Sequence, residues 1–185
     1  RRKRYREASR AYADAKARIP ILERQHWSLL YTAGIANERI KNWKVAEADF
    51  LKALELSPGQ PFVLNYLGYS WVEQGQNVEK AKKMIEKAVK QRPRDGYIVD
   101  SLGWAHYRLG DFENAVKNLE RAVELRADDP IITDHLGDIY WKMGRQNEAK
   151  FQWERSLVLG AEEEAAILIR QKLKEGLLDS QKGTQ

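Results

Sequence analysis

The chain has 185 residues and no cysteine, which excludes disulfides, thiolate zinc sites and a cysteine nucleophile. Its net charge of +5 arises at one end: five of the first six residues are basic, and the remaining 27 basic residues balance the 27 acidic ones. No apolar run approaches the roughly 20 residues that span a bilayer and no signal peptide is visible, so direct membrane insertion is not expected.

The first expected element is a helix over residues 2–19. Its key residues have the same spacing as a later set: Ala8, Tyr12, Ala15 and Pro20 match Ala46, Phe50, Ala53 and Pro58. Residues 1–22 are therefore predicted to be the second helix of a truncated repeat and its linker. The next helix should be lengthened to about residues 21–40. The uncovered side of a truncated repeat is an apolar face, which would favour self-association.

Four segments of nearly equal length follow: 27–60, 61–95, 96–129 and 130–163. Their central glycines (34, 68, 103 and 137) are 34, 35 and 34 residues apart, and their alanines (46, 81, 115 and 149) are 35, 34 and 34 apart. The extra residue falls near 76–78, in a turn, where an insertion costs little. Apolar residues recur at three and four positions between turn signals, so each segment should form two helices. The further helices are expected at 43–56, 61–74, 78–91, 97–109, 112–125, 130–143, 146–159 and 162–178.

The small residues of each segment have a packing role in this interpretation. A glycine within a helix costs roughly 1 kcal/mol relative to alanine, a cost that is tolerated where two helix backbones approach closely. Residues 164–178 should form a capping helix that covers the last open face of the array. Residues 179–185 should be a disordered tail.

This pattern resembles the tetratricopeptide repeat family, whose unit is a helix–turn–helix of 34 residues. Gly137, Tyr140, Ala149 and Trp153 match its hallmark well. The third repeat departs from it, with His106 at an aromatic position. The resemblance implies an all-α, right-handed superhelical solenoid of antiparallel helix pairs. Its last two repeats are most similar to the C-terminal repeats of large proteobacterial members. Some of these are exported, so the resemblance points to a periplasmic, outer-membrane-attached location and leaves a cytoplasmic one open.

The sequence gives little support to catalysis. His26, His106 and His135 have no partner at metal-ligand spacing, and neither a nucleophile elbow nor a phosphate loop is present. His106 is expected to be buried. No enzyme activity, cofactor or metal is therefore predicted.

The predicted function is protein–protein interaction, as a scaffold or adaptor that binds a partner segment. In such a solenoid the first helix of each pair lines the concave face, and the family pattern implies which positions are exposed there. The candidate groove residues are Tyr31, Phe62, Asn65, Tyr66, Tyr69, Tyr97, Asp100, Trp104, Tyr107, Asp134, Asp138 and Trp141. The rings would provide contact area, and the line of Asn65, Asp100 and Asp134 would hydrogen-bond a peptide backbone.

The net charge of the expected groove affects which class of partner it can bind. The expected groove acids and bases are Glu38, Glu73, Asp100, Asp134 and Asp138 against Arg39, Arg108 and Lys142. This net charge of −2 would favour neutral or basic protein segments and repel nucleic acid. The carboxylate clamp of some chaperone-binding relatives is absent. The alternative is an RNA-binding helical-repeat module, against which the acidic groove and the glycine–alanine pattern argue.

Overall fold

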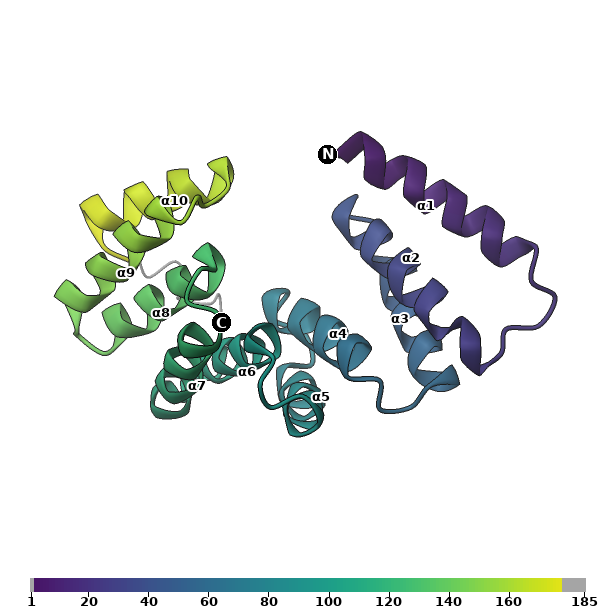
Figure 1. Cartoon of the computed structure of the whole chain (residues 1–185), viewed down its shortest axis with the longest axis horizontal. Helices are drawn as coiled ribbons and strands as arrows, with labels where there is room; N and C mark the ends of the chain where they lie inside the picture. The colour runs from purple at the N-terminus through teal and green to yellow at the C-terminus, as the bar shows by residue number, and fades with distance from the viewer. Residues whose placement is uncertain (1, 178–185) are drawn as a thin grey trace, which may run out of the picture.

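The computed structural model describes residues 2–177, in which every regular element is a helix (Figure 1). The elements in order are α1 (Arg2–Ala17), the 3-10 turn η1 (Arg24–His26), α2 (Trp27–Arg39), α3 (Trp43–Leu56), α4 (Pro61–Glu73), α5 (Val78–Gln91), α6 (Gly96–Arg108), α7 (Phe112–Leu125), α8 (Pro130–Lys142), α9 (Gln146–Val158) and α10 (Glu163–Glu175). The predicted all-α solenoid is confirmed. The helices follow one another around an open arch, with α1 and α10 at its two ends.

Four antiparallel pairs build the arch, namely α2–α3, α4–α5, α6–α7 and α8–α9. The central glycine of each first helix lies directly under a large side chain of its partner helix. A Cβ atom on Gly103 would lie 2.7 Å from Cγ of Leu119, and one on Gly137 would lie 2.4 Å from Cδ1 of Trp153. These distances are too short for a side chain, which confirms that the glycines are packing residues.

The turns within the pairs need a left-handed residue after the first helix. Gly110 and Gly144 adopt φ values of 76° and 78° there, a conformation that glycine accepts without steric cost. In the first pair Lys41 takes this position with φ 65°. In the second pair Asn77 adds a further left-handed residue with φ 49°, at the place to which the extra residue was assigned.

The predicted long helix over residues 21–40 is wrong, because α2 begins only at Trp27. The backbone N–H of Glu23 donates to Nδ1 of His26 at 2.9 Å, and this capping interaction starts a separate 3-10 turn. Ile21 is 75% exposed. Residues 18–23 therefore connect two helices instead of lengthening one.

The two ends of the array pack as the sequence indicates. On α1, Ser9 donates to Oδ1 of Asn37 at 2.8 Å, and Lys16 pairs with Asp49 of α3. At the other end α10 buries Ile169 against α9 and α8. The predicted tail at 179–185 and the last residue of the predicted capping helix lie outside the described residues.

Candidate interaction surface on the first helices

The candidate groove residues lie on α2, α4, α6 and α8, the first helices of the four pairs. In Figure 1, α4 lies on the side of α5 that faces the opening of the arch. Helix α6 contacts both α4 and α8. Residues at equal positions on these helices therefore form rows that run along the array.

Aromatic side chains connect neighbouring first helices. Tyr31 on α2 and Tyr66 on α4 meet edge to face, with ring centroids 6.0 Å apart. Tyr66 also packs against Phe50, at 5.2 Å. Both tyrosines are half-buried. They fill the gap between helices and also present part of each ring to the groove.

A three-ring stack follows on α6 and α8. Trp104 lies between Tyr107, at 4.7 Å, and His135, at 4.2 Å, with both partners tilted by 17°. The indole Nε1 of Trp104 donates to Oε1 of Glu73 at 2.5 Å. The orientation of this indole is thus fixed before any partner binds.

The tyrosine hydroxyls of α4 remain protonated donors. Tyr66 donates to Oε2 of Glu38 at 3.2 Å, and burial, followed by the charge of Glu38, raises its pKa far above the ordinary value. Burial, followed by the charge of Glu73, likewise raises the pKa of Tyr69. Tyr69 is half-buried on the same helix.

Asp100 is buried, contrary to the expected exposure in the groove. Its Oδ1 lies 2.9 Å from Nδ1 of His135, and both side chains are less than a tenth exposed. Burial lowers the pKa of His135, but the carboxylates of Asp100, Asp134 and Asp138 outweigh it and raise that pKa to about 9. His135 is therefore a cation at neutral pH and forms an ion pair with Asp100.

Asp134 and Asp138 are paired as well. Nζ of Lys172 on α10 lies 2.8 Å from Asp134 and 2.7 Å from Asp138. Asp138 is buried and also accepts a hydrogen bond from Nε1 of Trp153 at 2.9 Å. Asp100 and Asp134 were expected to be free acceptors for a peptide backbone. Both are instead engaged, Asp100 by His135 and Asp134 by Lys172. Asn65 differs, because no donor within residues 2–177 reaches its buried Oδ1.

These pairs change the charge expected for the groove. The predicted net charge of −2 treated His135 as neutral and omitted Lys172, which comes from another helix. Counting both as cations brings the balance to zero. The remaining acids have partners too: Glu38 pairs with Arg39 and Glu73 with Arg108. The preference for basic segments thus loses its basis.

Three predicted ring residues lie at the margins of the surface. Phe62 and Tyr97, at the starts of α4 and α6, are 37% and 48% exposed. Each carries an arginine over its face, Arg92 and Arg126 respectively, with 4.5 Å between guanidinium carbon and ring centroid. At the far end Trp141 packs against Trp153 at 5.4 Å and lies over Gly176.

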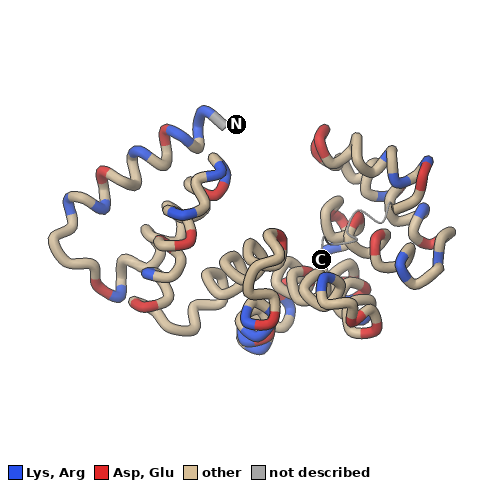
Figure 2. Tube along the Cα trace, turned by 180° about the vertical axis from the view of Figure 1, so that it is seen from behind, with Lys and Arg blue, Asp and Glu red and all other residues tan. Residues whose placement is uncertain are grey.

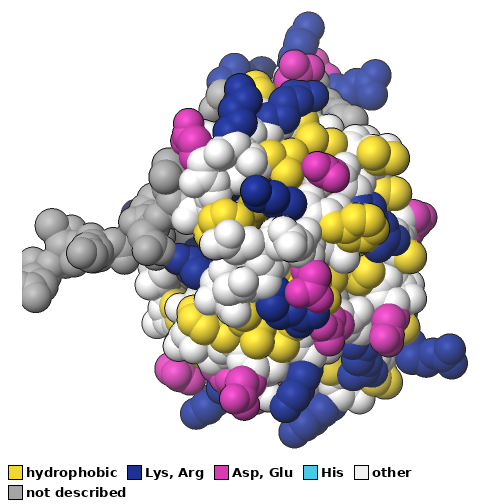
Figure 3. Space-filling model, turned by 90° about the vertical axis from the view of Figure 1, so that its left-hand side faces the viewer, with side chains coloured by type: hydrophobic (Ala, Val, Ile, Leu, Met, Phe, Trp, Pro, Cys, Tyr) yellow, Lys and Arg dark blue, Asp and Glu magenta, His cyan; other side chains and the backbone are white. Residues whose placement is uncertain are grey.

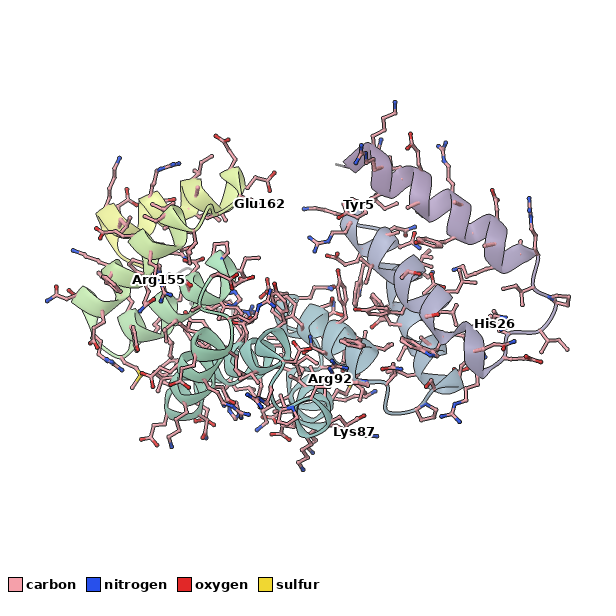
Figure 4. All side chains as sticks on the ribbon, viewed as in Figure 1. Tyr5, His26, Lys87, Arg92, Arg155 and Glu162 are labelled. Carbon is pink, nitrogen blue, oxygen red and sulfur yellow. The ribbon has the colours of Figure 1, made fainter. Side chains whose placement is uncertain are left out.

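Sequence reasoning missed the two arginines, although a signal was present. Arg92 and Arg126 are 34 residues apart, nearly the spacing of Phe62 and Tyr97. They line a surface hollow of about 590 Å³ at the turn between α5 and α6. Figure 4 shows Arg92 beside α4 and α5, and Lys87 on the outer side of α5.

The outer surfaces are different in character. Figure 2 shows basic residues along α1 and gathered on α5. Figure 3 shows hydrophobic side chains scattered among charged ones on the side that carries the last helices. Exposed apolar residues of α9 and α10 include Phe151, Val158, Ile167 and Leu168.

Within residues 2–177 no group of three His, Asp or Glu side chains could hold a metal ion. His106 is buried as predicted and bonds to Asp111 at 2.9 Å. The same residues include no helix that is long and apolar enough to cross a membrane.

Comparison with known proteins identifies the helix pairs. A TPR repeat model matches residues 103–144, and a tetratricopeptide repeat model matches residues 134–157. Residues 103–157 therefore match tetratricopeptide repeats, and the chain is similar to proteins of that family. A TPR repeat-containing protein of Pseudomonas aeruginosa is 34% identical over 83 residues, which make up 45% of this chain and 14% of that protein.

Solved structures of tetratricopeptide repeat proteins share the fold. A thermophilic TPR protein of Thermus thermophilus superposes with a TM-score of 0.74 at 20% identity, over 94% of this chain and 91% of that one. MamA from Desulfovibrio magneticus, from residue 41 to its end, gives 0.63 at 19% identity, over 88% and 96%. Tetratricopeptide repeats mediate interactions between proteins.

Proposed function

We propose that this chain is a scaffold or adaptor module that binds a segment of a partner protein on the concave side of α2, α4, α6 and α8. The helix pairs would act as repeat units 27–60, 61–95, 96–129 and 130–163. Residues 1–22 would be the second helix of a preceding repeat with its linker, and residues 164–178 would be a capping helix. Self-association through α1 remains a prediction.

The observation that carries the proposal is the row of fixed, half-buried rings. Tyr66, Trp104 and Tyr107 are partly exposed and pack against neighbouring rings, and Tyr69 is partly exposed on the same helix as Tyr66. Rings that are ordered before binding lose little conformational entropy, which is why such residues contribute strongly to interfaces. The groove acids are satisfied internally, so we infer that shape and apolar contact, more than charge, select the partner.

The structure leaves Asn65 as the one predicted acceptor without a donor within the described residues. Its amide could rotate to bond the backbone of a bound segment, fixing the segment's register. A modest interface of this kind predicts an affinity on the order of micromolar, or about −8 kcal/mol.

RNA binding is the alternative function. No observation favours it on the groove side, because the groove charges are balanced and paired. A labelled RNA should not shift in the presence of the chain at any salt concentration. A salt-dependent shift would support the alternative, because phosphate binding weakens as salt rises.

The proposal is tested by pull-down of partners with the full-length protein. We expect the double variant Tyr69→Ala/Trp104→Ala to lose the partner while circular dichroism still reports the helical array. The matched control is Lys82→Ala/Lys87→Ala on α5, which should leave capture intact. Loss of capture with the lysine pair alone would place binding on the outer face and refute the proposal.

A further inference from the structure

Two equivalent rungs stand at the edge where α4 and α6 begin. In each, an arginine that follows a second helix covers an aromatic ring at the start of a first helix: Arg92 over Phe62, and Arg126 over Tyr97. Arg126 also donates to Oη of Tyr97 at 2.7 Å. A guanidinium stacked on a ring keeps its plane fixed while leaving in-plane N–H groups available to a carboxylate.

The turns that carry these rungs are held by hydrogen bonds from the following repeat. Arg121 on α7 donates to the carbonyl oxygen of Pro93. One repeat later, Arg155 on α9 donates to the carbonyl oxygen of Ala127 at 2.6 Å. Gln91 similarly donates to Gly59 at 2.8 Å. The edge is therefore a regular, preorganised surface, and its side chains need little ordering when a ligand binds.

The hollow of about 590 Å³ between the rungs is basic. Its lining includes Arg92, Arg94 and Arg126 against a single carboxylate, Asp95. Asp95 pairs with Arg92 at 3.4 Å. Arg126 has no carboxylate partner and Arg94 has no hydrogen bond or ion pair within the described part of the chain. Arg94 and Arg126 are thus left without an ion-pair partner in a hollow that the exposed ring of Tyr97 also lines.

The carboxylates of the adjoining turn do not neutralise these cations. Asp129 accepts hydrogen bonds from the backbone N–H groups of Ile131 and Ile132, at 2.9 Å and 3.1 Å, and so caps α8. Burial, followed by Asp129, raises the pKa of the Tyr97 hydroxyl. Among residues 2–177, no ion pair joins Asp129 to Arg94 or Arg126.

We propose that this Arg–aromatic edge is a second docking surface, which binds an acidic protein segment carrying an apolar side chain. A carboxylate of the segment would accept hydrogen bonds from Arg94 and Arg126, and its apolar side chain would lie on Tyr97. The inference goes beyond the proposed function, because it concerns a different face and the opposite charge preference from the one first expected of the groove.

The test is a fluorescence-anisotropy titration of the whole chain with a fluorescein-labelled peptide, Asp-Glu-Phe-Asp-Glu-Leu. We expect saturable binding that weakens as salt rises. The same peptide with lysine at each acidic position should not bind. Arg94→Glu should weaken binding by about tenfold or more, as expected for a charge-assisted contact, whereas Arg94→Lys should retain most of it.

The matched control is Arg170→Glu, which makes the same charge change at an exposed position of α10. It should leave the dissociation constant within about twofold of the wild type. An equal loss with Arg94→Glu and Arg170→Glu would mean that only net charge matters and would overturn the proposal. No saturation at roughly 1 mM peptide, or tighter binding of a labelled uridine oligonucleotide than of the peptide, would overturn it as well.

Failure of this edge is distinguishable from failure of the groove. The variants Tyr69→Ala and Trp104→Ala should bind the acidic peptide normally, because neither residue lines the hollow. Tyr97→Ala should weaken binding of the acidic peptide without changing the melting temperature of the chain. If only Tyr69→Ala and Trp104→Ala weakened peptide binding, the peptide would be located in the groove. That result would refute the proposed docking surface at the edge.

Discussion

Lys172 provides the sharpest test of how the last helix is joined to the array. Its ammonium group lies between Asp134 and Asp138, and the side chains of Lys172 and Asp138 are 16% and 8% exposed. Replacing it by methionine keeps the apolar body of the side chain and removes the ammonium group with its hydrogen bonds. Asp134 and Asp138 would then lose the ammonium group that lies between them.

The expected cost follows from this geometry. Removing one partner of a buried ion pair costs about 3–5 kcal/mol. Asp134 is more exposed than Asp138, and Trp153 still donates to Asp138, so about 2–4 kcal/mol is expected here. For a chain of this size that corresponds to a fall in melting temperature of roughly 4–16 °C. Because repeats contact only their neighbours, the loss should be concentrated in α8–α10.

The loss of stability in the Lys172→Met variant should depend on pH, and the pKa of Asp138 sets the direction of that dependence. Burial raises the pKa of Asp138 and outweighs the opposing effect of Lys172, so Lys172→Met should raise that pKa further. A carboxyl whose folded pKa lies above its unfolded value favours the folded state at acidic pH, and this stability is lost as pH rises through the folded pKa. The deficit of the variant should therefore be larger at roughly pH 7 than at roughly pH 4.

Differential scanning fluorimetry measures the deficit, and hydrogen exchange of the α10 amides locates it. The control is Lys174→Met, the same substitution at an exposed position of α10. Equal deficits for the two variants, or a deficit that grows as pH falls, would refute the reasoning.

Three further predictions concern stability. Gly103→Leu would add a side chain whose Cβ would lie 2.7 Å from Leu119 on α7, and this overpacking should cost about 1–3 kcal/mol. Calorimetry should show a lower melting temperature for this variant. The control Ala13→Leu, at an exposed site, should keep the wild-type melting temperature. Lys41→Gly should raise the melting temperature by roughly 1–4 °C, because the left-handed φ of 65° disfavours lysine; an unchanged or lower value would contradict it. The raised pKa of His135, about 9, means that its ion pair with Asp100 stabilises fully below the unfolded pKa near 6.5 and is lost as pH rises through about 9. Wild-type stability should fall over that range in denaturant titrations, and a His135→Gln variant that falls equally would count against the pair.

The repeat pattern was sufficient to predict the helix pairs. The regular spacing of glycines and alanines reports a packing constraint within one hairpin, so it is visible in the sequence. The start of α2 was missed because it depends on a local bond between Glu23 and His26. That bond lies outside the repeat and leaves no periodic signal.

The candidate surface was predicted less well, for a related reason. The rows of rings follow from helical register and could be placed on the first helices. The pairing of Asp100 with His135 needs the distance between adjacent repeats, and that of Asp134 and Asp138 needs a lysine from α10. Such contacts between helices decide which polar groups are free, and spacing along one helix does not reveal them.

Site-specific photocrosslinking can locate a bound partner segment on the solenoid. A benzoylphenylalanine residue replaces Tyr69 on the concave side in one variant and Phe151, which is 61% exposed on α9, in another. After illumination with the bound partner, we expect a crosslink from position 69 and none from position 151. Sequencing of the crosslinked peptide should identify one partner segment. A crosslink from position 151 without one from position 69 would contradict the proposed groove.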